Sequence, residues 1–144
     1  MAKAYASAII PAPIEKVWRT VRDFNGLPGW HPGIARSEIE DGRAADAVGC
    51  VRSFYLQDGT HVREQLVALD DVQHQLSYVF ATPAFPVRNY LAWMRLSPVT
   101  ATGATFAEWC ATFDEAPEDA GKYEAIVAQH VFAPGWQALA AQLG

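Results

Sequence analysis

Residues 118–143 read EDAGKYEAIVAQHVFAPGWQALAAQL and carry apolar side chains at every third or fourth position. This spacing predicts one long C-terminal helix from Glu118 to Leu143. One broad predicted face holds Ile126, Val127, His130, Val131, Pro134, Gly135 and Ala138, and a neighbouring face holds Phe132, Trp136, Leu139 and Leu143. Because apolar residues cover more than half of the circumference, we expect this helix to be buried on two sides.

The middle of the chain is rich in predicted strands that could surround this helix. Alternating apolar residues bounded by turn residues predict seven strands. They cover Lys3–Ile10, Ile34–Asp41, Cys50–Gln57, Thr60–Leu69, Gln75–Ala81, Val87–Leu96 and Thr105–Asp114. Asp58-Gly59 predicts a two-residue hairpin turn. Strands at this spacing favour an antiparallel meander, and the long helix would cover its concave face.

Two short helical segments are predicted between the first and second strands. Pro13 suits the first turn of a helix, and the apolar spacing from Ile14 to Val21 gives that helix one buried stripe. The second segment lies between Phe24 and Gly33, where glycines and prolines interrupt it. A twisted sheet curled around one helix seldom fills the space between them, so we expect a cavity there.

Composition indicates a globular protein with one domain, residues 1–144. The net charge is −5 without a basic run, which argues against nucleic acid and an anionic membrane surface as partners. No apolar run is long enough for a membrane span, and the N-terminus does not resemble a signal peptide. Cys50 and Cys110 lack metal-type or redox-type spacing, which suggests reduced thiols, and we expect a cytoplasmic protein.

Several short motifs along the chain together point to a known family. They are Ile10–Trp18 (IPAPIEKVW), Asp23-Phe24, Trp30–Ile34 (WHPGI), Gly49 with Arg52, Glu64-Gln65-Leu66, Asp70-Asp71, Tyr78, Arg88-Asn89-Tyr90, and Trp109 with Phe113. Through these residues nearly the whole chain resembles the START-like (SRPBCC) superfamily, closest to its bacterial polyketide-cyclase/dehydrase-type group. It is more distantly similar to plant abscisic-acid receptors and birch-pollen-allergen-like proteins.

The resemblance implies an α+β helix-grip fold, in which a seven-stranded antiparallel sheet curls around the C-terminal helix and leaves a ligand cavity. It does not imply a catalytic residue set, because the superfamily includes both binders and enzymes. The abscisic-acid receptors carry a Ser-Gly-Leu-Pro gate between the third and fourth strands, where this chain has the Asp58-Gly59 turn. Their hormone-gripping lysine is replaced near His31, so we do not expect a hormone receptor.

Strand alternation, anchored on an inward-facing Glu64 as the resemblance implies, predicts the lining of the cavity. The predicted ligand-binding residues are Arg52, Phe54, Leu56, Val62, Glu64, Tyr78, Phe80, Tyr90, Ala92, Glu108, Val127, Val131 and Gly135. Leu66, Met94, Phe106 and Cys110 are also expected to face inward. An apolar pocket with a few polar groups suits a small, mostly apolar ligand with one or two oxygens.

The mouth of this cavity is predicted at Trp30 and His31. The apolar surface of Trp30, Pro32 and the loop Ala84-Phe85-Pro86 could form either the cavity entrance or a contact between two copies. The sequence therefore leaves a monomer and a homodimer open.

The polar lining residues allow more than one interpretation. Glu64 and Glu108 would lie roughly 14 Å apart, since two strands separate theirs, and this exceeds the usual span of a two-carboxylate hydrolase. Arg52 could hold a ligand carboxylate or enolate, or it could form an internal salt bridge with Glu64. Tyr78 and Tyr90 could donate hydrogen bonds to a ligand carbonyl or bond to neighbours within the core.

Other residues with chemical potential show no matching partners. The histidines lack metal-ligand spacing, and no phosphate-binding or dinucleotide motif is present, so neither a metal nor a cofactor is predicted. His130 is expected in the core, on the apolar face of the long helix. Pro134 interrupts that helix by removing a backbone hydrogen bond, and we expect a kink or a locally widened turn there.

Two main function classes follow. The first is binding or transport of a small hydrophobic molecule, lipid-like, polyketide or aromatic, in the internal cavity. The alternative is a polyketide cyclase, aromatase or dehydratase that uses the same cavity, with Arg52, the two tyrosines and the glutamates orienting an enolate and moving protons. A third, weaker possibility is a collapsed cavity in a partner-binding module.

Overall fold

The computed structural model describes residues 1–144, and its elements follow the predicted order. The strands are β1 (Ala2–Ile10), β2 (Ile34–Ile39), β3 (Val51–Leu56), β4 (His61–Asp70), β5 (Gln75–Thr82), β6 (Val87–Val99) and β7 (Ala104–Glu115). They form one antiparallel sheet in the order β1-β7-β6-β5-β4-β3-β2. The predicted meander from β2 to β7 is confirmed, and β1 adds to it by pairing with β7.

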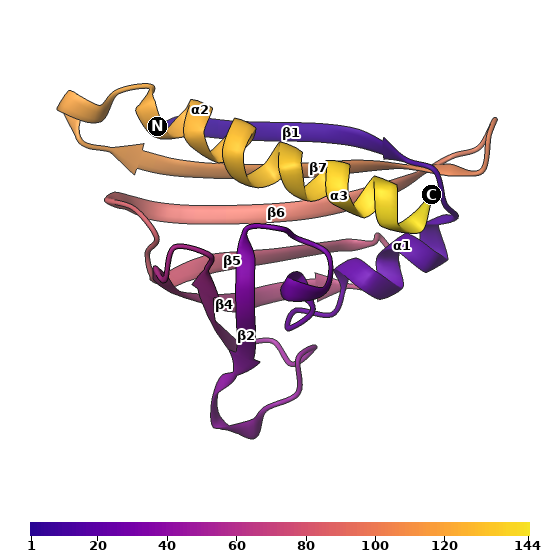
Figure 1. Ribbon diagram of the computed structural model, residues 1–144, viewed down its shortest axis with the longest axis horizontal. Helices are drawn as coiled ribbons and strands as arrows, with labels where there is room; N and C mark the ends of the chain where they lie inside the picture. Colours follow the sequence, from indigo (N-terminus) through magenta and orange to yellow (C-terminus); the bar gives the residue numbers. More distant parts are fainter.

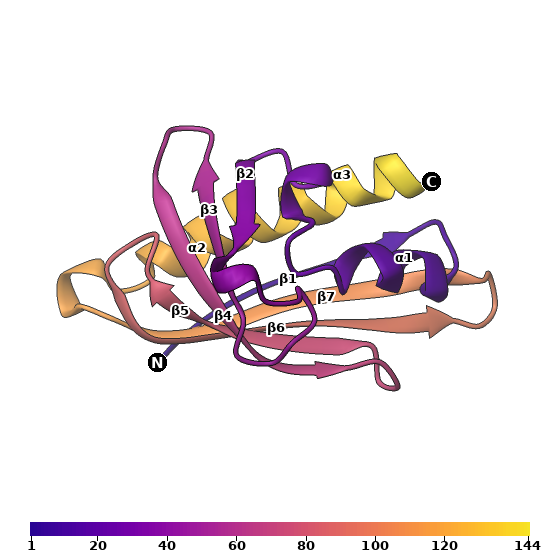
Figure 2. The same ribbon diagram turned by 90° about the horizontal axis from the view of Figure 1, so that it is seen from below.

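The helices lie on one face of this sheet. They are α1 (Ile14–Val21), α2 (Lys122–Val127) and α3 (Ala133–Leu143), and a π-helical segment, Ala128–Phe132, joins α2 to α3. A single 3-10 turn, Leu27–Gly29, is the second short helix between β1 and β2. Figure 1 shows α2 and α3 as one continuous rod in front of β1, β7 and β6. Figure 2 shows β2 and β3 rising from the curled sheet on the side of this rod, which gives the α+β helix-grip fold.

The C-terminal helix differs from the prediction at its start. The 3-10 turn Pro117–Asp119 and Gly121, which has a φ of 80°, precede the helix, so α2 begins at Lys122 rather than Glu118. The carboxylate of Glu115 accepts hydrogen bonds from the backbone N–H groups of Gly121 and Tyr123, at 3.0 and 2.8 Å. A strand residue therefore fixes the point at which the helix begins.

The prediction that the helix is buried on two sides is wrong. Phe132, Trp136 and Leu139 have no exposed surface, but Ile126 is 36% exposed and His130 is also exposed. Because His130 is exposed, its expected position in the core is also wrong. The widened turn predicted near Pro134 is confirmed by the π-helical segment, which ends two residues before a proline that lacks an N–H to donate.

The β3–β4 hairpin is also slightly different from the prediction. The Leu56 N–H donates to the Thr60 carbonyl at 2.9 Å, which leaves Gln57, Asp58 and Gly59 as the loop. Gly59 has a φ of 90°, and a three-residue hairpin loop favours a left-handed residue at this place. The Asp58-Gly59 signal therefore located the turn correctly but gave a loop that is one residue too short.

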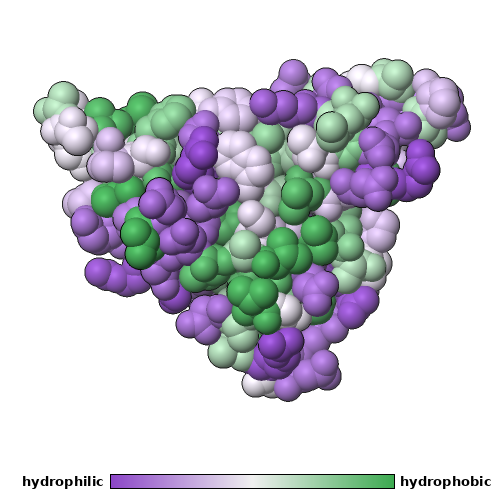
Figure 3. All heavy atoms as spheres, turned by 180° about the vertical axis from the view of Figure 1, so that it is seen from behind, coloured by the Kyte–Doolittle hydropathy of each residue, from purple (hydrophilic) through white to green (hydrophobic).

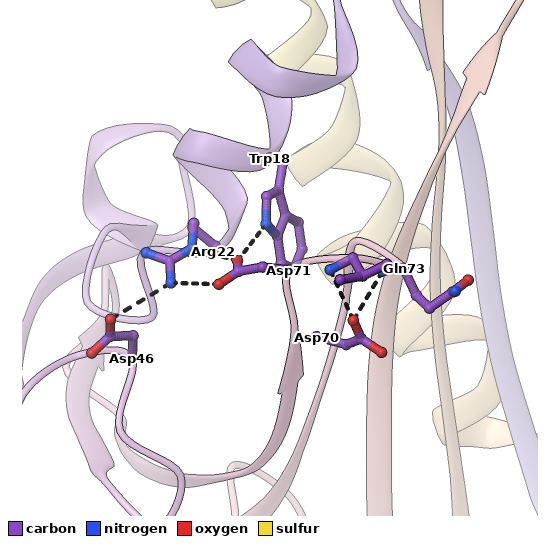
Figure 4. Close-up of polar contacts among 7 residues, drawn as sticks. Trp18, Arg22, Asp46, Asp70, Asp71 and Gln73 are labelled. Atoms are coloured by element: carbon purple, nitrogen blue, oxygen red, sulfur yellow. Dashed lines mark hydrogen bonds and ion pairs between the residues drawn. The ribbon is translucent and has the colours of Figure 1, made fainter.

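The first helix is fixed to the sheet by Asp71, in the turn between β4 and β5 (Figure 4). Its carboxylate accepts hydrogen bonds from Trp18 Nε1 at 2.8 Å and from Arg22 Nε at 2.9 Å. Arg22 also lies 3.5 Å from Asp46 in the loop before β3. The Arg22 guanidinium and the Trp18 indole hold the pKa of Asp71 below its usual value. These contacts place α1 and the following segment at one end of the concave face.

The outer face of the sheet carries apolar as well as polar side chains. Figure 3, which views the molecule from behind, shows a hydrophobic patch near the centre of this face. The exposed large hydrophobic residues on the strands include Tyr5, Val67 and Leu91, at 40%, 40% and 43% exposure. No helix in the chain has the length and hydropathy needed to cross a membrane.

Candidate functional site: a cavity between sheet and helix

A cavity of about 250 Å³ lies between the concave face of the sheet and the C-terminal helix. Eleven of the residues expected at the site line it: His31, Arg52, Phe54, Leu56, Val62, Glu64, Tyr78, Phe80, Tyr90, Val127 and Val131. Seven further lining residues were not predicted as ligand-binding: Leu27, Ile34, Ala84, Phe85, Trp109, Tyr123 and Ile126. Alternation on β3, β4 and β5 brings seven of the first set together, from Arg52 to Phe80, because residues two apart share one face.

Glu108 does not face the cavity. It lies on the outer face of β7, where its carboxylate accepts a hydrogen bond from Tyr5 Oη at 2.6 Å and one from Arg95 Nε at 3.3 Å. Trp109 faces inward instead, so the predicted inward set on β7, including Phe106 and Cys110, is wrong by one residue. The alternation separates two faces but does not say which is buried. The large Trp109 and the charge of Glu108 were the signals that could have decided it.

Three other predicted site residues are buried near the cavity without lining it. Ala92 faces the core from β6, where it pairs with Tyr78 on one side and Ala111 on the other. Gly135 lies under His31 and Trp109, which fill the space next to its Cα. Trp30 stacks on Trp136 with centroids 5.9 Å apart, and it is buried.

The predicted mouth at Trp30 and His31 is therefore wrong, because both residues are buried. The lining residues that keep exposed surface include Leu56 at the end of β3, Ala84 and Phe85 in the β5–β6 loop, and Ile126 in α2. The Phe85 ring stacks on Tyr123 of α2 with centroids 5.0 Å apart. Of the two roles left open for the Ala84-Phe85-Pro86 loop, its position fits the cavity entrance.

Arg52 and Glu64 form an ion pair in the wall of the cavity. Arg52 Nε donates to Glu64 Oε1 at 2.9 Å, and Nη2 lies 2.7 Å from the same oxygen. Arg52 Nη1 donates to the Phe24 carbonyl at 3.1 Å, and the guanidinium carbon lies 3.9 Å from the centre of the Phe24 ring. Burial raises the pKa of the Glu64 carboxyl, and the Arg52 charge acts against that rise. Of the two interpretations of Arg52, the internal salt bridge is the one observed.

The phenols of Tyr78 and Tyr90 supply the remaining polar groups. Tyr78 Oη accepts a hydrogen bond from Trp109 Nε1 at 2.9 Å, which fixes both rings in the wall. Burial is the main cause that raises the pKa of both phenols far above their ordinary value. Both groups therefore remain neutral O–H groups at any physiological pH and cannot serve as phenolate bases.

His31 connects the segment before β2 to the π-helical segment. Its Nδ1 accepts a hydrogen bond from the Gly33 N–H at 3.0 Å, so the ring proton is on Nε2. Nε2 lies 2.7 Å from the Val131 carbonyl and donates to it. Burial lowers the pKa of His31, and the nearby Arg52 charge lowers it further. A neutral histidine thus holds the helix against the cavity wall.

The sequence profile of the family described as polyketide cyclase / dehydrase and lipid transport matches residues 1–144. The chain belongs to this family. Solved structures of similar length share this fold. A Thermobifida fusca protein solved by solution NMR is 32% identical, with a TM-score of 0.89 over 100% of this chain and 94% of the other.

An uncharacterized protein from Bacillus thuringiensis, solved by crystallography, is 27% identical to this chain. Its TM-score is 0.86 over 99% of this chain and 98% of the other. A point mutant of norcoclaurine synthase from Thalictrum flavum, in complex with a transition-state analogue, has a TM-score of 0.76 over 98% and 92% of the two chains. At 14% identity, that likeness shows the fold alone.

Proposed function

We propose that this chain binds a small hydrophobic molecule in the cavity between its sheet and its C-terminal helix. The observation that carries this proposal is the lining, since 15 of the 18 residues around the cavity are hydrophobic. Membership of a family that includes lipid transport supports it. The volume of about 250 Å³ is below the usual range for drug-sized ligands and suits a molecule of one or two rings.

A neutral two-ring fluorescent probe, 4-(methylamino)-7-nitrobenzofurazan, tests this proposal on the full chain. We expect saturable binding with enhanced probe emission, and we expect Val62→Phe to abolish it because the new ring occupies the cavity. Val67→Phe is the matched control, since Val67 lies on the outer face of the same strand with 40% exposure. Circular dichroism establishes that both variants are folded. Equal binding by the two folded variants would show that the probe does not occupy the cavity and would contradict the proposal.

The second candidate is a cyclase- or dehydratase-type reaction on the bound molecule. Glu64 favours it, because burial raises the pKa of this carboxyl and it lies in the cavity wall, where it could accept a proton from a ligand. Mass spectrometry after incubation with a short poly-β-ketone tests this candidate. An enzyme should convert this substrate, and Glu64→Gln should abolish the conversion. If the wild type binds the substrate without converting it, the enzyme hypothesis is ruled out for that substrate.

A further inference from the structure

The two charged groups in the cavity wall differ in what they leave free for a ligand. Arg52 directs Nε and Nη2 at one oxygen of Glu64 and Nη1 at the Phe24 carbonyl. The rings of Phe24 and Tyr78 lie 3.9 and 4.8 Å from its guanidinium carbon. Nη2 is fully buried although it lacks a well-angled acceptor. The donors of Arg52 that have partners are therefore directed at groups of the protein, and Nη2 is buried.

Glu64 keeps an acceptor free. Both contacts from Arg52 go to Oε1, and no group of the protein donates a hydrogen bond to Oε2. Glu64 is nevertheless 5% exposed, and it lines the cavity. A carboxylate oxygen in a largely apolar cavity is unfavourable without a donor, so a ligand that supplies one gains a hydrogen bond that the protein itself does not provide.

The same end of the cavity contains donors that are not charged. Tyr78 already accepts from Trp109 Nε1, which leaves its own proton to donate, and Tyr90 brings a second phenol to the lining. A hydroxyl group combines one donor with acceptor capacity, so it can donate to Glu64 and accept from a tyrosine. A ketone can accept from a tyrosine but gives Glu64 no donor.

We propose that the ligand of this cavity is a neutral, mostly apolar alcohol or phenol whose hydroxyl donates to Glu64 Oε2, and that the cavity rejects carboxylates. This inference rests on the proposed function and specifies its ligand. Arg52 and Glu64 together are neutral, so a charged ligand of either sign must be desolvated without a net opposite charge in the cavity wall. A carboxylate is disfavoured further because it would meet the carboxylate of Glu64.

Four ligands with one ring system test the proposal: 2-naphthol, naphthalene, 2-naphthoate and 2-naphthylmethylamine, titrated into the full chain at pH 7.5. Calorimetry gives the affinities, and backbone amide shifts locate the site. We expect 2-naphthol to bind about tenfold more tightly than naphthalene, the gain typical of a hydrogen bond to a charged group. We expect 2-naphthoate and the ammonium ligand to bind at least about tenfold more weakly than 2-naphthol.

The variant Arg52→Met/Glu64→Leu removes both charges together, so neither is left unpaired. In this variant the ratio of the 2-naphthol and naphthalene affinities should fall to about one. Glu108→Gln is the control, because that carboxylate lies on the outer face, and it should keep the wild-type ratio. Tyr90→Phe gives an independent test and should reduce the ratio several-fold.

The outcomes separate this inference from the proposed function. If naphthalene or 2-naphthoate shifts the cavity residues and binds as tightly as 2-naphthol, the hydroxyl preference is wrong while the cavity remains a binding site. Tighter binding of the ammonium ligand would also overturn it and would indicate a cationic ligand. If none of the four shifts any cavity residue, the proposed function itself fails.

Discussion

Gly135 allows the helix to approach the imidazole of His31 and the indole of Trp109. A Cβ at this position would lie 2.8 Å from His31 Cδ2 and 3.0 Å from Trp109 Cζ3. Both rings are buried and held by hydrogen bonds, His31 to Val131 and Trp109 to Tyr78. The absence of a side chain at residue 135 is therefore a packing requirement and not a source of flexibility.

Gly135→Ala should destabilise the protein by about 1–3 kcal/mol, the usual cost of forcing an extra methyl group into a packed core. Urea unfolding followed by tryptophan fluorescence measures the loss. Gly29→Ala is the matched control, since a Cβ there meets nothing within 4 Å. A variant Gly135→Ala as stable as Gly29→Ala would mean that the two rings move aside at little cost.

Removing Arg52 alone should be more damaging than removing Arg52 and Glu64 together. The side chains are 3% and 7% exposed, so Arg52→Met leaves a carboxylate buried without its partner. Breaking such a pair typically costs about 3–5 kcal/mol, whereas exchanging both members for apolar residues is often neutral. Chemical denaturation of the single variant Arg52→Met and the double variant Arg52→Met/Glu64→Leu checks this order, and a double variant that is the less stable of the two would refute it.

At the scale of elements, His31 links the segment before β2 to the helix. Its pKa in the folded protein is lowered from the ordinary value of 6.5, so the folded state binds this proton less readily than the unfolded chain. The stability that this contributes is complete above about pH 6.5 and is lost as the pH falls toward the lowered pKa. Protonation would also place a proton on Nδ1, which then could no longer accept from the Gly33 N–H.

We therefore expect the free energy of unfolding to fall between pH 7 and pH 5, and His31→Gln to fall less steeply over the same range. Thermal or urea unfolding in a pH series provides the measurement. His130→Gln is the control, because the side chain of His130 is exposed on the far side of the helix, and it should follow the wild type. Parallel profiles for the wild type and His31→Gln would exclude His31 as the source of the pH dependence.

Strand positions could be predicted from the sequence to within a few residues, because alternation and turn residues are local signals. The assignment of faces was right on β3 to β6 and wrong on β7, where Glu108 was placed inside and Trp109 outside. The mouth was misplaced for a different reason. Phe85 and Tyr123 meet through the curl of the sheet, and no local pattern connects a loop at residue 85 to a helix at residue 123.

At the scale of the whole molecule, aromatic rings at two places separate the sheet from the helix. Trp109 stacks on Phe132 with centroids 4.5 Å apart, and Phe85 stacks on Tyr123 at 5.0 Å. The lining of the cavity includes valines, among them Val62, Val127 and Val131, which are too small to fill the remaining space. The cavity is therefore a consequence of side-chain size along the seam between the two layers.

Phe85 in the β5–β6 loop stacks on Tyr123 in the first turn of α2, and Phe85 keeps exposed surface whereas His31 and Trp136 are buried. The proposed ligand could enter or leave the cavity through a small displacement of that loop while α3 stays packed on β1 and β7. The rate of ligand exchange would then not depend on the free energy of global unfolding. A variant stabilised by better packing around α3 would still exchange its ligand at the original rate.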